Sequence, residues 1–395
     1  NFRPTLDLNF ATEKKLDSRI TYTRTGAASF VNEFGKVVLV GDNVPRFDHD
    51  QDTGECKGLL IEESRTNISP YSNDLSGFSS VNMTKTANDA VAPDGTTTAT
   101  KLEHGGGGST WYLDYIDNSI NAQNAGTYTY SVWVKAPDDQ PDDYYGCRIA
   151  LLHSTGGNVE VNFGLSRNWR RISVTRTYGA SDSGKLRVHP IIFRASPGST
   201  SGGKVVPSYV WVWGAQLEQG AFPTSYISIA GATRGTDLVE ITEEEFSEFY
   251  NRTEGSFVSE IMLKPSFPVT GYASIMMTLS DGSYDNRVTL GSSTGSAAFN
   301  ADVSIGGTNN RAALGSYTSG SHSIKAAIAY KASDSAGSLN GAAAVTTSPS
   351  GTLPLLTRAD IGKDHGNFNP LNGHVKRIMY YSKRLSNNQL RTLTS

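Results

Sequence analysis

The amino-acid sequence predicts an all-β protein with two antiparallel β-sandwich (jelly-roll) domains, preceded by a β-hairpin-rich N-terminal segment. The first observation is composition: of 395 residues, 37% are hydrophobic, only 18% are charged and 40 are glycine. β-branched residues fit a pleated sheet and glycine supplies the dihedral angles of turns, so this balance favours short strands over helices. The other two observations are the alternation of apolar and polar residues, and the closely spaced clusters of Gly, Pro, Asp and Asn between alternating stretches.

Four segments are expected along the chain. Residues 1–75 form a β-rich N-terminal module, 76–229 a first sandwich, 230–250 a short helical linker and 251–395 a second sandwich. About 75 residues make only a thin core by themselves. The N-terminal module therefore either forms a domain of its own or completes one of the two sandwiches.

The clearest strand of the first sandwich lies at residues 127–135. Four apolar residues share one face of it, namely Tyr128, Tyr130, Val132 and Val134. Because side chains alternate across a strand, we expect this face to lie in the core and Trp133 to lie on the opposite face. All four strand tryptophans, Trp133, Trp169, Trp211 and Trp213, are expected to pack in the core or between sheets, since large aromatic residues are highly buried on average.

Two short helices are predicted from capping signals. Thr242 and Glu245 have the spacing of a capping box at the start of an acidic stretch, and Ser386 and Gln389 have the same spacing near the C-terminus. In such a box the first side chain accepts a backbone N–H of the first turn, and the second side chain accepts the N–H of the first residue.

Charge and cysteine usage exclude several classes of function. The net charge is −3 and the isoelectric point about 6.2, with no basic block, so we expect no nucleic-acid partner. No apolar run approaches the ~18 residues that span a bilayer, which predicts no membrane insertion. Two cysteines, Cys56 and Cys147, make no disulfide framework and are typical of a protein that folds in a reducing cytoplasm.

One segment has alternating carboxylates that could converge on calcium: Asp48, Asp50 and Asp52, followed by Gly54. Oxygen ligands from a loop are the ligands that Ca²⁺ prefers. The spacing departs from an EF-hand, because Thr53 stands where that loop needs glycine. A hairpin turn explains the same residues and is the favoured interpretation, with structural calcium as the alternative. No other cofactor is expected.

Sugar recognition needs an aromatic face to stack on a pyranose and polar groups beside it to bind the hydroxyls. Two loops supply both kinds of residue. The candidate glycan-binding residues are Trp111, Tyr112, Asp114 and Tyr115 in the first, and Tyr144, Tyr145 and Arg148 in the second.

No catalytic residue is predicted. Residues 291–295 match G-x-S-x-G, but that motif needs a preceding strand and a following helix, and the residues after it favour a loop and a strand. A pair of carboxylates for glycoside cleavage depends on distances in the fold, which leaves a glycan-cleaving protein as the least favoured alternative.

Three local patterns resemble proteins of tailed-phage particles. The first comprises residues 7–24, 45–50 and 58–67, among them Asp7-Leu8-Asn9-Phe10 and Gly58-Leu59-Leu60-Ile61-Glu62. It resembles the opening module of phage and prophage tail-fibre, tail-spike and head-spike proteins.

The second pattern covers residues 126–136, 168–174, 211–218 and 222–227, and it looks like a carbohydrate-binding-module jelly roll found inside phage structural proteins. The third covers residues 371–378 and 380–386. It resembles the closing strand of concanavalin-A/laminin-G-like sandwiches in the phage head-spike and tail-fibre families.

The resemblance implies a non-catalytic spike or fibre protein on the virion surface, assembled in the bacterial cytoplasm and homotrimeric. Its expected partners are host surface polysaccharide and other virion proteins. Repetition of weak sites around the particle would raise avidity. The alternative is a purely structural decoration or adaptor subunit, because both sandwich families also serve as spacers.

Overall fold

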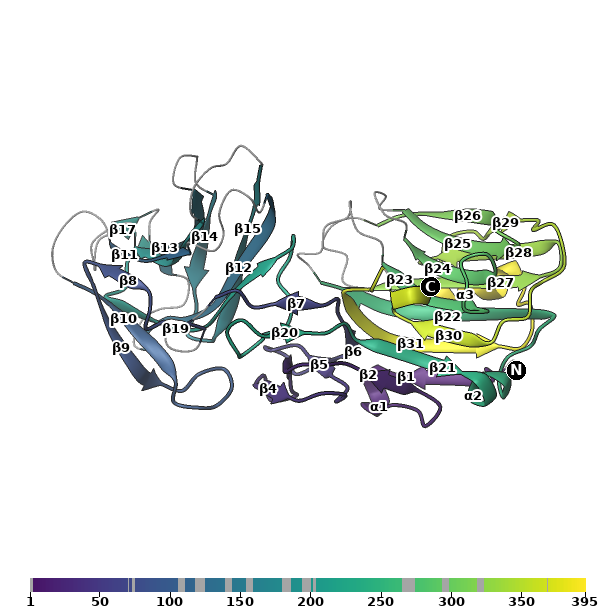
Figure 1. Cartoon of the computed structure of the whole chain (residues 1–395), viewed down its shortest axis with the longest axis horizontal. Coiled ribbons are helices and arrows are strands. Elements are labelled where there is room, and N and C mark those ends of the chain that lie inside the picture. Colours follow the sequence, from purple (N-terminus) through teal and green to yellow (C-terminus); the bar gives the residue numbers. More distant parts are fainter. Residues whose placement is uncertain are drawn as a thin grey trace.

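The computed structural model describes residues 3–69, 71–72, 75–105, 111–117, 125–138, 144–153, 159–179, 186–193, 200–201, 204–264, 274–292, 298–317, 323–367 and 369–395. These residues form antiparallel β-sheets with a few short helices, so the predicted all-β sandwich class is confirmed. Figure 1 shows two sandwiches side by side, with the N-terminal strands along and between them. We call them the small sandwich and the large sandwich.

Within the described residues, the large sandwich has an eight-stranded and a seven-stranded sheet. The first has the order β29-β28-β27-β22-β31-β6-β5, with β1 also paired to β31, and the second the order β2-β21-β30-β23-β24-β25-β26. The strands are β1 (Leu6–Asn9), β2 (Thr21–Thr23), β5 (Phe47–His49), β6 (Cys56–Ile61), β21 (Leu238–Thr242), β22 (Glu254–Leu263), β23 (Ile275–Ser280), β24 (Arg287–Ser292), β25 (Ala298–Ile305), β26 (Thr308–Ser316), β27 (Ile324–Lys331), β28 (Asp334–Leu339), β29 (Val345–Thr347), β30 (Arg358–Ile361) and β31 (Gly373–Tyr381).

The small sandwich packs two sheets, each five-stranded in the part that the structure describes, with orders β15-β12-β19-β10-β9 and β14-β13-β16-β11-β8. The strands are β8 (Ser79–Val81), β9 (Met83–Ala90), β10 (Ala99–His104), β11 (Trp111–Asp117), β12 (Gly126–Lys135), β13 (Tyr144–His153), β14 (Val159–Leu165), β15 (Arg170–Tyr178), β16 (Leu186–Phe193) and β19 (Tyr209–Gln219), with the short pair β17 (Thr200–Ser201) and β18 (Lys204–Val205). Tyr128, Tyr130, Val132 and Val134 of β12 lie in its core, as the alternation predicted.

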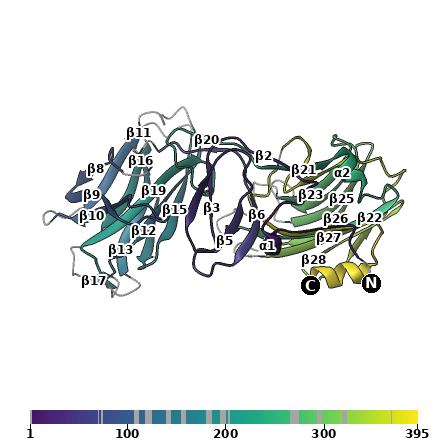
Figure 2. The same ribbon diagram turned by 90° about the horizontal axis from the view of Figure 1, so that it is seen from below.

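Two short β-pairs connect the sandwiches: β3 (Ala28–Val31) with β4 (Val37–Val40), and β7 (Arg65–Thr66) with β20 (Thr233–Arg234). Figure 2 shows β3, β5 and β6 between the two sandwiches. Strand β6 passes so close to β31 that a Cβ atom at Gly58 would lie 2.2 Å from the carbonyl oxygen of Val375. Because Gly58 also has a φ of +106°, only glycine fits there without strain.

Of the two alternatives for the N-terminal module, the strand pairing favours completion of a sandwich. Strands β1, β5 and β6 pair within one sheet of the large sandwich and β2 within the other. The expected linker at 230–250 instead contributes β21, which pairs with β2 and β30. The physical reason is burial: apolar residues of the N-terminal strands belong to the same hydrophobic core as β21, β22 and β31.

The helices are α1 (Phe10–Glu13), α2 (Glu243–Ser247), α3 (Asn387–Thr394) and the 3₁₀ turn η1 (His365–Asn367). Both hydrogen bonds of the Ser386–Gln389 capping box are present, as predicted. The Thr242 capping box is wrong: the helix begins after Thr242, but the threonine side chain makes no capping hydrogen bond. No helix in the described part of the chain is both long enough and apolar enough to cross a membrane.

Replacing Leu59 by alanine tests whether the N-terminal segment belongs to the large core. Leu59 is fully buried in β6 and pairs with Phe47 and Val375. We expect Leu59→Ala to lower the free energy of unfolding by about 2–5 kcal/mol, measured by denaturant titration. The control Leu39→Ala, at a β4 side chain that is 46% exposed, should change it by no more than about 0.5 kcal/mol. Equal effects of the two changes would contradict this assignment.

Candidate functional site

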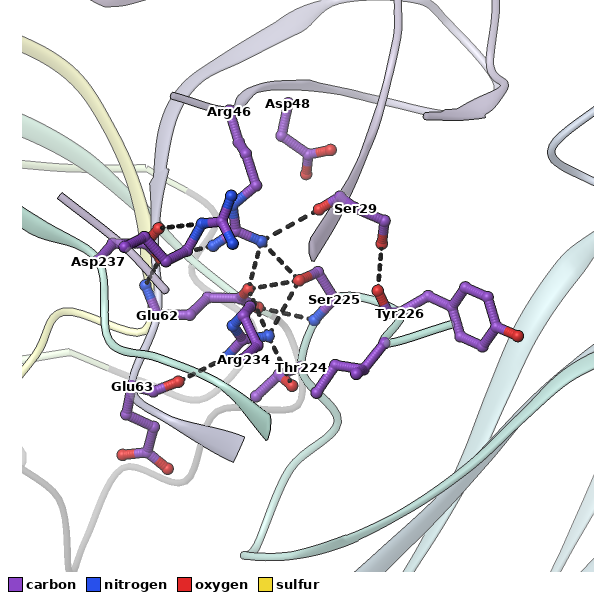
Figure 3. A network of polar contacts seen from close by, with 12 residues as sticks. Ser29, Arg46, Asp48, Glu62, Glu63, Thr224, Ser225, Tyr226, Arg234 and Asp237 are labelled. Atoms are coloured by element: carbon purple, nitrogen blue, oxygen red, sulfur yellow. Dashed lines mark hydrogen bonds and ion pairs between the residues drawn. The ribbon is translucent and has the colours of Figure 1, made fainter. Parts of the chain in front are cut away.

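A buried network of charges joins the sandwiches (Figure 3). We call it the charge network; it consists of Arg24, Arg46, Glu62, Arg234, Asp237 and Lys264. The carboxylate of Glu62 is paired with Arg46 at 2.8 Å, with Arg234 at 3.0 Å and with Lys264. The two carboxylates, both fully buried, thus contact four cationic side chains. Buried ions need such pairing, since their desolvation costs several kcal/mol each.

Asp237 is the second carboxylate of the charge network. Its Oδ2 lies 2.5 Å from Arg46 Nη2, and its Oδ1 lies 3.5 Å from Arg24 Nε and accepts the hydroxyl hydrogen of Tyr22 at 2.5 Å. The backbone N–H of Glu62 donates to the same Oδ2 at 2.8 Å. Asp237 therefore binds the start of β21 to the segments before β5 and after β6.

The small sandwich contacts the charge network through the segment after β19. Ser225 donates its backbone N–H to Glu62 Oε1 at 2.8 Å and its hydroxyl to Glu62 Oε2 at 2.6 Å. Arg46 and Arg234 donate to the same hydroxyl oxygen at 2.6 and 3.0 Å. Thr224, the neighbouring residue, donates to the buried Glu218 of β19. Thr224 is thereby bound to the small sandwich and Ser225 to the charge network.

The pKa of Glu62 follows from these contacts. Burial alone would raise it, but the positive charges of Arg234, Lys264 and Arg46 outweigh burial, so the pKa of Glu62 lies well below its ordinary value of 4.5. Glu62 is therefore ionised in the folded protein at neutral pH.

A cleft of about 620 Å³ lies beside the charge network, with walls from both sandwiches. Its small-sandwich wall includes Trp133, Arg171 and Tyr226, and its large-sandwich wall includes His49 and His374. Ser225 and Lys264, which both contact Glu62, also line the cleft. The cleft is therefore formed in the folded chain without a ligand.

The floor of the cleft contains an Asp–His pair. Oδ2 of Asp48 lies 2.8 Å from Nε2 of His374, and Oδ1 of Asp48 accepts the backbone N–H of Val31 at 2.6 Å. Nδ1 of His49, the next residue, lies 3.1 Å from the carbonyl oxygen of Val31. Burial would raise the pKa of Asp48, but the contacts with His374 and Val31 hold it below 3.8.

Aromatic residues continue from the cleft along the outer face of the small sandwich. Trp133 and Trp213 are paired across β12 and β19 and are almost fully buried, with ring centroids 5.3 Å apart. They lie outside the sandwich core, in a separate cluster with Tyr226 and with Val37 of β4. They are therefore buried but, contrary to the expectation, they pack neither in the sandwich core nor between its two sheets.

Tyr209 and Trp211 lie on the same face of β19 and are only half-buried. We call them the aromatic pair; their ring centroids are 5.2 Å apart with the planes at 80°. Lys101 lies over the Tyr209 ring and Lys135 over the Trp211 ring, at 5.0 and 5.1 Å. The Trp211 indole N–H donates to Asp89 at 2.8 Å. The prediction that Trp211 packs in the core or between sheets is thus wrong, because its side chain lies on the outer face of the sheet, partly buried against the Trp133–Trp213 cluster.

Of the predicted glycan-binding residues, only Arg148 has a side chain that the structure describes. The backbone of β11 and β13 is described, but the side chains of Trp111, Tyr112, Asp114, Tyr115, Tyr144 and Tyr145 lie outside the described part. Those predictions remain predictions. Arg148 is described: it is 8% exposed and ion-paired with Glu160 of the neighbouring strand. The guanidinium that was expected to bind sugar hydroxyls is thus engaged in an ion pair within the sheet.

Asp48, Asp50 and Asp52 are not brought together as a cation site. Asp48 points to His374, whereas Asp50 Oδ1 accepts the backbone N–H groups of Asp52 and Thr53, both at 3.1 Å. Gly54 has a φ of +70°, as the turn requires. Across the ranges that the structure describes, no group of three or more His, Cys, Asp or Glu could hold a metal ion. These bonds support the turn interpretation.

From the sequence, Asp48 and Asp50 of the cleft were singled out as candidate calcium ligands, but no residue of the charge network was. Arg46 and Glu62 appeared only inside the phage-like pattern, and Arg234 and Asp237 lay in the expected linker. The available signal was a charged residue directly after the apolar run Leu59-Leu60-Ile61, where burial is expected and a partner is therefore needed.

No family model matches the sequence, and no curated protein matches it either. Among solved structures, the chain is similar to the CBM40 module of the Ruminococcus gnavus IT-sialidase bound to α2,3-sialyllactose, with 14% identity over 37% of this chain and 84% of that one and a TM-score of 0.31. The tandem CBM22-1–CBM22-2 domain of Paenibacillus barcinonensis Xyn10C is 8% identical over 83% of this chain and 93% of that one, with a TM-score of 0.29.

A third similar structure is the SAP-like pentraxin of Limulus polyphemus, at 11% identity over 36% of this chain and 70% of that one, with a TM-score of 0.28. At such identities and TM-scores these likenesses carry no argument about function. The sandwich architecture stated above rests on the strand pairing of the chain itself.

Replacing Glu62 by glutamine tests the charge network. We expect Glu62→Gln to lower the free energy of unfolding at pH 7 by about 3–5 kcal/mol, because it leaves buried cations uncompensated. The folded-state pKa of Glu62 is depressed, so its contribution is present above pH 4.5 and is lost as the pH falls toward the folded-state pKa. The difference between wild type and variant should therefore shrink in acid, as measured by urea titration at several pH values.

The matched control is Glu33→Gln. Glu33 forms an exposed ion pair with Lys14 at 3.0 Å, so its loss should cost no more than about 1 kcal/mol. If Glu62→Gln proved as mild as Glu33→Gln at pH 7, the charge network would not stabilise the fold.

Proposed function

We propose that this chain is a non-catalytic, glycan-binding structural protein of a phage particle, and that the aromatic pair is part of its glycan-binding surface. The observation that carries the proposal is the partial exposure of Tyr209 and Trp211 on a rigid strand, with charged groups beside them. A pyranose has one apolar face and a rim of hydroxyls. Aromatic rings bury such a face, and neighbouring polar groups bind the rim.

The surroundings of the aromatic pair supply the polar groups. Lys101 of β10 and Lys135 of β12 lie over the rings of Tyr209 and Trp211, and Asp89 of β9 accepts the Trp211 indole N–H, so that ammonium donors and a carboxylate acceptor adjoin the aromatic pair. Strand β19 lies between β12 and β10 in the sheet. Side chains on such a central strand are held in place before a ligand arrives, which lowers the entropic cost of binding.

The phage assignment rests on the sequence patterns, above all on residues 7–24, 45–50 and 58–67. We propose accordingly that the chain acts at the virion surface as a spike or fibre, that it is a homotrimer, and that its partner is host surface polysaccharide. Three copies of a weak site on one particle would act together, so avidity would exceed the affinity of a single site.

One observation favours the alternative of a purely structural subunit. Phe34, Leu39 and Val44, on and next to the β3–β4 hairpin, are 77%, 46% and 41% exposed. Apolar side chains gathered on one projecting hairpin are typical of a surface that contacts another protein. In that case the hairpin would bind a neighbouring virion protein, and the chain would bind no glycan.

Binding of the purified chain to a panel of bacterial surface polysaccharides tests the proposal. We expect saturable binding that the double change Tyr209→Ala, Trp211→Ala weakens about tenfold or more, a loss of about 1.4 kcal/mol. The control is Tyr284→Ala, since Tyr284 is an aromatic residue of the large sandwich with 42% exposure. A second double variant, Trp111→Ala with Tyr112→Ala, tests the surface expected from sequence.

Polymer length is measured in the same samples. Unchanged length with binding lost only in the Tyr209–Trp211 variant supports recognition without cleavage at the aromatic pair. Shortened polymer would overturn the non-catalytic assignment, and absence of binding to every glycan would favour the structural subunit.

A further inference from the structure

The cleft between the sandwiches has features of a binding site that differ from those of the aromatic pair. It has a volume of about 620 Å³, and its lining residues come from stretches far apart in the sequence, namely 29–60, 133, 171, 223–226, 262–264 and 374. Three of its side chains carry polar groups that the described residues leave without a partner, and each of them is held in a fixed orientation by its other polar atoms.

The first of these side chains is Arg171 of β15. Its guanidinium lies over the Trp133 ring at 4.4 Å and donates to the carbonyl oxygen of Thr224 at 2.5 Å and to Ser131 Oγ at 2.9 Å. Both acceptors are neutral. Among the described residues no carboxylate lies within ion-pair distance of Arg171, and its buried Nε has no hydrogen-bond partner. A guanidinium offers five N–H donors in a fork that matches a carboxylate.

The charge around Arg171 is not balanced by the charge network. That network already places four cationic side chains against two carboxylates. Arg171 adds a further positive charge. The buried carboxylate of Glu218, which lies outside the network, accepts hydrogen bonds from the backbone N–H and the hydroxyl of Thr224. Burial lowers the pKa of Arg171, as does the positive charge of Arg234, and the carboxylates of Glu218 and Glu62 offset this only in part. An added anion beside the guanidinium would therefore be stabilising.

The other two side chains are His49 and His374, which are 5% and 4% exposed. A carbonyl oxygen only accepts hydrogen bonds, so His49 donates Nδ1–H to Val31 and its Nε2 is left as an acceptor. His374 donates Nε2–H to Asp48, which leaves Nδ1 as its acceptor. Both remaining nitrogens are buried and without a partner. Hydroxyl groups of a ligand would satisfy them.

We propose that the cleft binds a saccharide that carries a carboxylate, with the carboxylate at Arg171 and hydroxyl groups at His49 and His374. This inference rests on the proposed glycan-binding function and adds the substrate class. Phe30, half-buried on β3, also lines the cleft and offers an apolar wall to a sugar ring. An acidic sugar supplies in one molecule the three kinds of group that the cleft lacks: an anion, hydroxyl donors and an apolar face.

The test uses matched polymers that differ only in charge. The full chain is titrated with polygalacturonate, alginate and hyaluronan, and with the carboxyl-reduced form of each, and binding is measured by calorimetry. We expect at least one acidic polymer to bind tenfold or more tightly than its reduced form. Arg171→Gln should abolish this preference while leaving the affinity for the reduced form within about twofold.

Arg170→Gln is the control, because Arg170 is the exposed neighbour of Arg171 on β15 and its loss removes the same charge. Arg171→Lys keeps the charge and should retain part of the preference, which guards against a folding defect in the glutamine variant. His49→Gln should weaken binding of the acidic and reduced forms alike, because the proposed partners of His49 are hydroxyl groups, which both forms carry.

The outcomes separate the two proposals. Equal affinity for acidic and reduced polymers, or a preference that Arg171→Gln leaves intact, would overturn the cleft assignment even if the Tyr209–Trp211 variant loses glycan binding. Binding of no polymer, acidic or neutral, by wild type would overturn the glycan-binding function together with the inference built on it.

Discussion

The carboxylate of Glu62 is the point on which the arrangement of the two sandwiches depends. It lies directly after β6 of the large sandwich and accepts two hydrogen bonds from Ser225 of the segment that leaves the small sandwich. Because it is fully buried, it is stable as an anion only with the cations that surround it. The Glu62 carboxylate therefore fixes three chain regions to one another: the N-terminal segment that carries Arg46, the segment after β19 that carries Ser225, and β20 through Arg234.

The cleft and the aromatic surface follow from that constraint. Ser225 is followed by Tyr226, whose ring packs on Trp133 and Trp213 and whose carbonyl oxygen accepts the hydroxyl hydrogen of Ser29 on β3. The position of Ser225 therefore also fixes the β3–β4 hairpin, whose Val37 packs in the cluster of Trp133 and Trp213. Tyr209 and Trp211, further along β19, are only half-buried. Arg171 stacks on the same Trp133 ring and reaches the cleft from there. Polar groups without partners occur where these fixed segments meet, as is common at sites that bind ligands.

Sequence patterns predicted what depends on local periodicity and missed what depends on long-range pairing. The alternation at Tyr128 to Val134 identified a strand and its buried face, and Ser386 with Gln389 identified a helix start. Both features are set by residues within one turn or one strand. The pairing of β1 and β6 with β31 joins residues more than 300 positions apart. No local pattern specifies such a partner, which is why the sequence left open whether residues 1–75 form a domain or complete a sandwich.

The central claim is that the charge network makes the two sandwiches one cooperative unit with a preformed cleft. Differential scanning calorimetry of the full chain tests this most directly. Coupled units unfold together, so the account predicts a single transition for wild type, with a calorimetric enthalpy equal to the van't Hoff enthalpy. In Glu62→Gln it predicts two resolved transitions. Two independent transitions in wild type at neutral pH would contradict the account, since the sandwiches would then be separate bodies and the cleft only a gap between them.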